Sequence, residues 1–97
     1  MLDLSAVNTK YYEIKDKEGN LLTIKNPSQK FFTKIKSVLS MDEMEQFGMI
    51  YDIFRDILNL NTQGKEYSME YVEQFDISTV GLVIEDYFTH VGEQLGK

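Results

Sequence analysis

The segment from Met44 to Leu60 carries two apolar stripes at helical spacing, where an ordinary surface helix carries one. The first stripe follows a spacing of three and four residues: Met44, Phe47, Tyr51, Phe54 and Leu58. The second stripe repeats that spacing about a quarter of a turn away: Ile50, Ile53, Ile57 and Leu60. Together they span about 220° of the helix circumference, whereas a surface helix needs only about 100°. The segment is therefore either the centre of the fold or part of an assembly surface.

Two short segments before this helix have the alternation of a β-hairpin, within residues 10–25. Residues 11–15 and 21–25 flank a five-residue connection in which Gly19 or Asn20 can adopt a positive φ. The register that pairs Lys15 with Leu21 puts four apolar side chains on one face: Tyr12, Ile14, Leu22 and Ile24. A two-stranded hairpin is only marginally stable alone, so we expect its apolar face to cover helices or its edge to join another strand.

Helical periodicity and start and stop signals predict helices at about residues 27–39, 41–60, 69–75 and 77–95. The last of these contains Gly81 and Gly92, each of which weakens a helix by about 1 kcal/mol relative to alanine unless another backbone packs closely there. The expected fold is a single domain, 1–97, of the mainly α class (small α+β). It has an N-terminal β-hairpin followed by three to four helices, and the second helix is central.

Capping signals indicate how the first two of these helices join. Asn26 and Pro27 suit the cap and the first position of the first helix. Ser40 and Glu43 predict a capping box for the second helix, with a hydrophobic staple between residues 39 and 44. This junction would turn the stripe that begins at Met44 toward the first helix. The last helix would then cover the stripe that begins at Ile50, so both stripes would be satisfied within one chain.

Composition excludes several classes of protein. The 97 residues include no cysteine, so disulfide frameworks, thiolate nucleophiles and cysteine-based zinc sites are impossible. The first residues lack the basic region and apolar core of a signal peptide, and the longest apolar run, 80–84, is too short to span a bilayer. We therefore expect a protein of the cytoplasm that does not associate with a membrane.

The net charge of −6 is divided unevenly along the chain. Residues 1–40 contain seven lysines and four acidic residues, a net charge of +3, whereas residues 41–97 contain three basic and twelve acidic residues, a net charge of −9. Duplex binding requires a basic face, so nucleic acid is not an expected partner. The division favours one of two interpretations: head-to-tail self-association that weakens with salt, or simply a solvated face on each half.

Patterns that would indicate catalysis or metal binding are weak. The one histidine, His90, has no accompanying nucleophile motif, and as a metal ligand it has only carboxylates such as Asp86 nearby. We interpret it as a residue at the boundary of the last helix's apolar stripe. The hairpin loop resembles the start of a calcium loop, but Pro27 stands where the bidentate glutamate belongs. We therefore expect no catalytic residue, no cofactor and no metal, and we do not expect an enzyme.

Soft and aromatic side chains gather near the start of the second helix. Such side chains suit either adaptable surfaces that bind helical partners or ordinary core packing. Because the stripes of the second helix can be covered within the chain, we expect partner contacts at the periphery. The candidate protein-binding residues are Tyr11, Phe32, Met49, Val83 and Phe88.

The order of residues along nearly the whole chain resembles the tail assembly chaperones of long-tailed bacteriophages and prophages. The resemblance lies in the opening Leu-Asp-Leu-Ser-Ala-Val-Asn of residues 2–8 and the strand Tyr-Tyr-Glu-Ile-Lys of 11–15. It continues in Leu-Leu-Thr-Ile-Lys-Asn-Pro-Ser of 21–28 and Ile-Leu-Asn-Leu-Asn-Thr-Gln-Gly-Lys of 57–65.

The resemblance implies a small, acidic, mostly helical and non-enzymatic protein in the cytoplasm of a bacterial host. Such a protein would self-associate as a homo-oligomer, bind the helical tape-measure protein and recruit tail-tube protein to it. The alternative is a structural virion component, such as a head-tail joining or tail-completion protein, for which an exposed hairpin edge would also serve.

Overall fold

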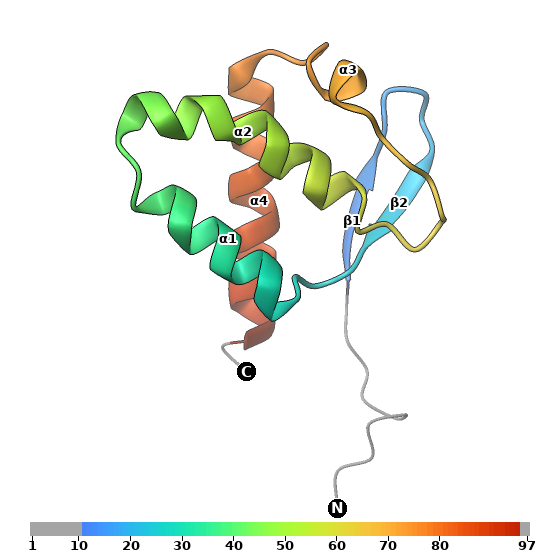
Figure 1. Ribbon diagram of the computed structural model, residues 1–97. Helices are drawn as coiled ribbons and strands as arrows, with labels where there is room; N and C mark the ends of the chain where they lie inside the picture. Colours follow the sequence, from blue (N-terminus) through green and yellow to red (C-terminus); the bar gives the residue numbers. More distant parts are fainter. Residues whose placement is uncertain (1–10, 96–97) are drawn as a thin grey trace, which may run out of the picture.

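A computed structural model describes the backbone of residues 11–95, two strands and four helices (Figure 1). The elements are β1 (Tyr12–Lys15), β2 (Leu21–Ile24), α1 (Gln29–Leu39), α2 (Glu43–Leu58), α3 (Met69–Val72) and α4 (Ile77–Leu95). The expected fold class is confirmed: the chain is mainly helical with an N-terminal hairpin, and α2 packs against α1, α3, α4 and β2. The opening residues 2–8, which carry part of the resemblance, lie outside the described residues.

The hairpin has the predicted register, with Tyr12 opposite Ile24 and Lys15 opposite Leu21. Gly19 has the positive φ that the connection requires, at 87°. The apolar face covers the helices, because Leu22 and Ile24 are completely buried. The outer edge of β2 is covered by residues 60–62, through backbone hydrogen bonds from residue 25 to residue 60 and from residue 62 to residue 23.

The junction between α1 and α2 differs from the prediction. Ser28, rather than Asn26, caps α1 by accepting a hydrogen bond from a backbone N–H at 3.2 Å, so the helix begins at residue 29 instead of 27. Asp42 caps α2 by accepting from the N–H of residue 45 at 2.9 Å, so the predicted Ser40 capping box is wrong. The staple is also wrong, because Leu39 and Met44 are 69% and 80% exposed. The carboxylate of Asp42 reaches the free N–H groups of α2, whereas Ser40 closes the end of α1.

The two apolar stripes of α2 are covered in its C-terminal half, but the first stripe does not face α1 as predicted. Phe54 packs edge-on against Phe75 with 5.5 Å between ring centroids, and the Tyr51 hydroxyl donates to the carbonyl of Phe75 at 2.7 Å. These contacts lie beside α3. The side of α2 that meets α1 carries Asp52 and Asp56, both of which contact the Lys34 ammonium, at 2.7 and 2.5 Å.

The later helix bounds follow local hydrogen bonding. The buried amide of Asn61 donates to the carbonyls of residues 58 and 65, which ends α2 at residue 58 rather than the predicted 60. Ser68 caps α3 as predicted, although α3 ends at residue 72 rather than 75. The side chain of Asp76 accepts from the N–H of residue 79 at the start of α4, whose predicted bounds of 77–95 are found.

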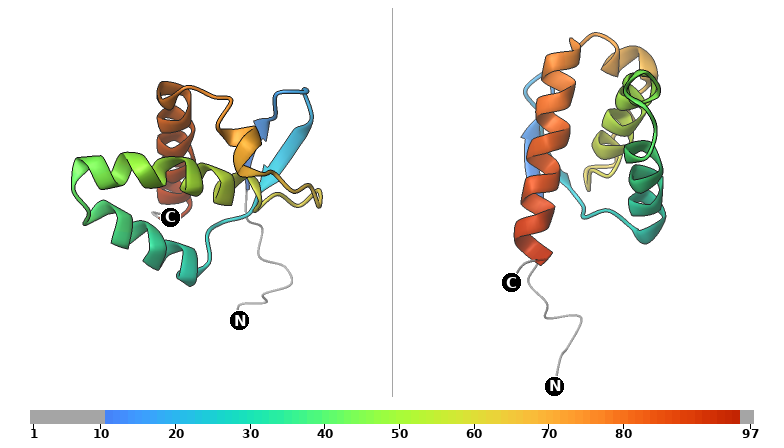
Figure 2. Two further views of the ribbon diagram at one scale, coloured as in Figure 1. Left: turned by 45° about the horizontal axis from the view of Figure 1, so that its top comes forward. Right: turned by 90° about the vertical axis from the view of Figure 1, so that its left-hand side faces the viewer.

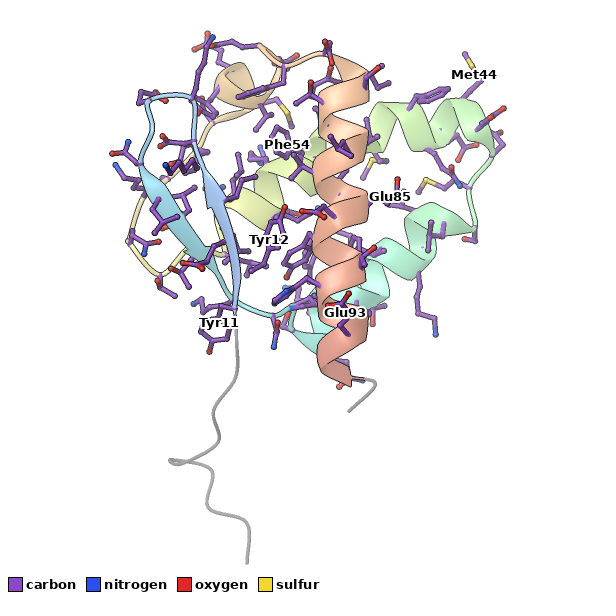
Figure 3. The ribbon with its side chains drawn as sticks, turned by 180° about the vertical axis from the view of Figure 1, so that it is seen from behind. Tyr11, Tyr12, Met44, Phe54, Glu85 and Glu93 are labelled. Carbon is purple, nitrogen blue, oxygen red and sulfur yellow. The ribbon has the colours of Figure 1, made fainter. Side chains whose placement is uncertain are left out.

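Tyrosine hydroxyls attach the hairpin to the helices. Tyr12 packs edge-on against Tyr87 and donates to Asp86 at 2.7 Å, as Figure 3 shows for Tyr12 between β1 and α4. Tyr67 donates to the hairpin-loop carboxylate of Asp16 at 2.7 Å. These bonds fix α4 and the segment around α3 relative to the hairpin.

A matched pair of leucines tests where the core lies. Leu58 is 3% exposed and Leu82 is 67% exposed, and both lie in helices. We expect Leu58→Ala to lower the free energy of unfolding by about 2 to 5 kcal/mol, because it leaves a cavity. Leu82→Ala should change it by less than about 0.5 kcal/mol. Urea denaturation followed by circular dichroism measures both, and equal losses would contradict the assigned core.

The Asp16 contact predicts an acid-dependent loss of stability. Desolvation raises the pKa of Asp16, but hydrogen bonds from Tyr67, Asn20 and Glu18 outweigh it and lower the pKa from 3.8 to about 2. Since the folded pKa lies below the unfolded one, this stabilisation is complete above the unfolded pKa and is lost as the pH falls from 3.8 toward 2.

Replacing the main side-chain donor tests this pH dependence. Tyr67→Phe should make stability fall less steeply between about pH 5 and about pH 2, as measured by urea denaturation at each pH. Tyr51→Phe is the control, because its hydroxyl donates to a carbonyl that does not titrate. A Tyr67→Phe protein with the wild-type pH slope would show that this hydrogen bond does not set the pKa of Asp16.

Candidate functional site

An apolar groove separates α1 from α4. Both helices pack on α2, but within residues 11–95 no backbone packing joins α1 to α4 (Figure 2). Val38 of α1 and Ile53 of α2 are buried at the base of the space that remains. The groove therefore exists because α1 and α4 both pack on α2 but do not pack closely on each other.

The groove has two connected parts. The larger has a volume of about 520 Å³ and lies between α1 and the C-terminal half of α4. The smaller, of about 230 Å³, continues toward the first turns of α2 and α4. The two parts share four lining residues: Val38, Leu39, Ile53 and Ile84. We call the whole the α1–α4 groove, and its further lining residues include Phe32, Ile35, Lys36, Phe47, Ile50, Gly81, Glu85, Phe88, Val91 and Gly92.

The two walls of the α1–α4 groove differ in the residues that they present. The α1 wall presents the bulky side chains of Phe32 and Leu39, and Leu39 is 69% exposed. The α4 wall carries Ile84, Phe88 and Val91 in its middle and is low only at Gly81 and Gly92, which are eleven residues apart and thus on the same face of the helix. A Cβ atom at either glycine would meet nothing within 4 Å. No close approach within the described chain therefore requires a glycine at either position.

Charge on the groove is confined to its rims. Lys36 lies on the α1 rim and Glu85 on the α4 rim, and the remaining lining is otherwise apolar except for Gln46. Neither Lys36 nor Glu85 forms an ion pair within residues 11–93. One rim is thus basic and the opposite rim acidic, with an apolar floor between them.

Apolar surface continues from the groove onto the corner between α1 and α2. Met44 and Phe47, at the start of α2, are 80% and 52% exposed, and Phe47 lines the groove. Figure 3 shows Met44 at the far end of α2, away from the hairpin. The N-terminal half of the first stripe is therefore surface, while its C-terminal half is core.

The structure brings together two of the five predicted protein-binding residues. Phe32 and Phe88 line the larger part of the groove from opposite walls. Tyr11, just before β1, is 39% exposed, and Met49 and Val83 are partly buried against the core; none of these three lines the groove. Sequence reasoning missed Leu39, which it assigned to the hydrophobic staple, and it missed Phe47, which it assigned to the stripe of α2 that was expected to face α1.

Polar groups elsewhere form structural contacts. His90 is half-buried beside Tyr12, with 5.7 Å between the ring centroids. Within the described residues, no group of three or more histidine and acidic side chains is arranged to hold a metal ion. The helices of this part of the chain are also too short or too polar to cross a membrane.

Three comparisons with known proteins find nothing similar. No protein-family model, no curated protein and no solved structure matches this chain.

Two helical glycines test whether the groove is open in solution. Gly48 in α2 and Gly81 in α4 both have free space where a Cβ would lie, but only Gly81 lines the groove. Alanine at either position should raise the free energy of unfolding by about 0.5 to 1 kcal/mol in dilute protein, because it restricts the unfolded chain. Thermal and urea unfolding measure this. A destabilising Gly81→Ala beside a stabilising Gly48→Ala would mean that the groove closes on itself.

Proposed function

We propose that this chain is a tail assembly chaperone of a long-tailed bacteriophage or prophage. It is a non-enzymatic protein of the bacterial cytoplasm that self-associates, binds a helix of the tape-measure protein and recruits tail-tube protein to it. The observation that carries the binding role is the α1–α4 groove, an apolar channel with uncovered side chains at its mouth. The phage setting is supported by the resemblance in residue order along the chain.

The groove has the dimensions and chemistry of a helix-binding site. Gly81 and Gly92 are separated by about three helical turns, or about 16 Å, which is the length of a short amphipathic helix. Helix-in-groove recognition places an apolar face with anchors at three- and four-residue spacing against such a floor. The charged rims favour a partner helix with an acidic side chain on the side that faces Lys36 and a basic side chain on the side that faces Glu85.

The glycines of the α4 wall favour a helical partner in particular. A helix backbone can approach another helix closely only where small residues face it, and Gly81 and Gly92 supply two such positions on one face. Met44 and Phe47 at the corner add adaptable and aromatic apolar surface beside the channel. A long tape-measure helix contains many amphipathic segments that fit this description.

The alternative function, a structural virion component that joins a neighbour through the hairpin edge, has less support. The outer edge of β2 is already covered by residues 60–62. The strand β1 has only four residues, and two of them, Glu13 and Lys15, are exposed and charged, which discourages edge pairing. A purified tail with stoichiometric amounts of this chain would nevertheless favour the structural role, since a chaperone leaves the finished tail.

Peptide binding tests the chaperone proposal. The probes are overlapping fluorescent peptides that cover the tape-measure protein encoded in the same tail gene cluster. Leu39→Lys should weaken the binding of the best peptide at least about tenfold, because a buried leucine contributes roughly 1.5 to 3 kcal/mol. Leu82→Lys is the matched control, since Leu82 is 67% exposed and does not line the groove.

Two outcomes would contradict this proposal. One is that no tape-measure peptide binds the wild-type protein and that co-expression leaves the solubility of the tape-measure protein unchanged. The other is that Leu82→Lys weakens binding as much as Leu39→Lys, which would place the contact elsewhere on the molecule.

A further inference from the structure

The mouth of the α1–α4 groove leaves large apolar side chains in water. Leu39, Met44 and Phe47 are each more than half exposed, and Leu39 and Phe47 line the same part of the groove beside the corner of α1 and α2. A monomeric soluble protein rarely leaves such a contiguous apolar patch beside an apolar channel. In the free protein, something is therefore expected to cover this surface.

The two walls of the groove complement each other in shape. The α1 wall projects Phe32 and Leu39, whereas the α4 wall is lowered at Gly81 and Gly92. The projecting wall does not fill the low positions of its own chain, because a Cβ at either glycine would meet nothing within 4 Å. It can fill the low wall of a second copy placed face to face.

Charge selects the same arrangement. A two-fold axis parallel to the groove lays α1 of one copy over α4 of the other, whereas an axis across the groove lays α1 over α1. With the parallel axis, the α1 rim that carries Lys36 lies along the partner's α4 rim that carries Glu85, so rims of opposite charge are paired on both sides. Lys36 lines the larger part of the groove and Glu85 the smaller part, and these two parts adjoin. With the other axis, each rim would face a rim of its own sign.

We propose that a second copy of this chain covers the α1–α4 groove in the free protein, through an isologous dimer with its two-fold axis along the groove. Phe32 and Leu39 of each protomer then occupy the low wall of the other, and two Lys36 to Glu85 contacts close the rims. The next step rests on the proposed function: a tape-measure helix competes with the second copy for the same groove. Self-association thus masks the binding surface until the helical partner is available.

Charge reversal tests the dimer without any partner protein. Lys36→Glu and Glu85→Lys place like charges at both rims of a homodimer, so each should raise the dimer dissociation constant about tenfold. An equimolar mixture of the two variants restores opposite charges at both rims, and it should form a heterodimer of about wild-type affinity. The double variant Lys36→Glu with Glu85→Lys should also recover the homodimer. Sedimentation equilibrium measures all four proteins and the mixture.

Matched controls separate the groove from general charge effects. Lys30→Glu and Glu93→Lys make the same charge changes on α1 and α4 at exposed positions that do not line the groove. These two variants and their mixture should dimerise like the wild type. Circular dichroism melting of each variant confirms folding, which exposed positions are expected to preserve.

The outcomes distinguish this inference from the proposed function. A wild-type protein that is monomeric at millimolar concentration, or variants whose mixture fails to recover association, would overturn the dimer while leaving peptide binding intact. A peptide that binds without dissociating the dimer would overturn the competition. A restored charge-swapped dimer together with peptide-driven dissociation supports both parts, and a dimer that binds no tape-measure peptide would refute the proposed function alone.

Discussion

The burial of α2 from several directions is the constraint on which the rest of this fold depends. Ile57 is completely buried and Phe54 and Leu58 are nearly so, which places one helix at the centre of a chain of only 97 residues. A domain of this size buries roughly 60 to 65% of its unfolded surface, so its remaining elements cover the centre incompletely. Here α1 and α4 each cover one side of α2 and leave the groove between them. The groove is thus a direct consequence of building the domain around a single helix.

Polar contacts hold the two walls of that groove at fixed positions. Lys34 contacts Asp52 and Asp56, which ties α1 to α2. On the other side, the Tyr87 hydroxyl donates to the carbonyl of residue 25 at 2.8 Å, while Tyr12 donates to Asp86. Burial, together with the hydrogen bond and the charge of Asp86, raises the pKa of Tyr12, so its hydroxyl stays a donor at neutral pH. The hairpin therefore serves as the brace that orients α4.

Local patterns in the sequence predicted the elements whose structure is decided locally. The register of the hairpin followed from alternation and turn residues, and the bounds of α4 followed from its periodicity. The predicted cap of α2 was wrong because Ser40 and Asp42 are both acceptable N-cap residues and lie two positions apart. In the structure Ser40 ends α1, and Asp42 caps α2. Phe32 and Phe88, which were predicted as partner contacts at the periphery, line the groove from opposite walls. No periodicity indicates how far apart two helices stand, so the groove itself was not predictable.

Two independent costs coincide at the α1–α4 groove, and their coincidence is the strongest physical reason to regard it as functional. Helical glycines at 81 and 92 forgo stability that alanine would supply, although no neighbour within the described chain needs the space. Exposed apolar side chains at Leu39 and Phe47 forgo the free energy of burial at the same surface. Each cost also occurs singly elsewhere: Leu82 is exposed and Gly48 has free space where a Cβ would lie, and neither residue lines the groove. At the groove, however, exposed apolar side chains and helical glycines occur together and line one channel, as expected where a second polypeptide supplies the missing contacts.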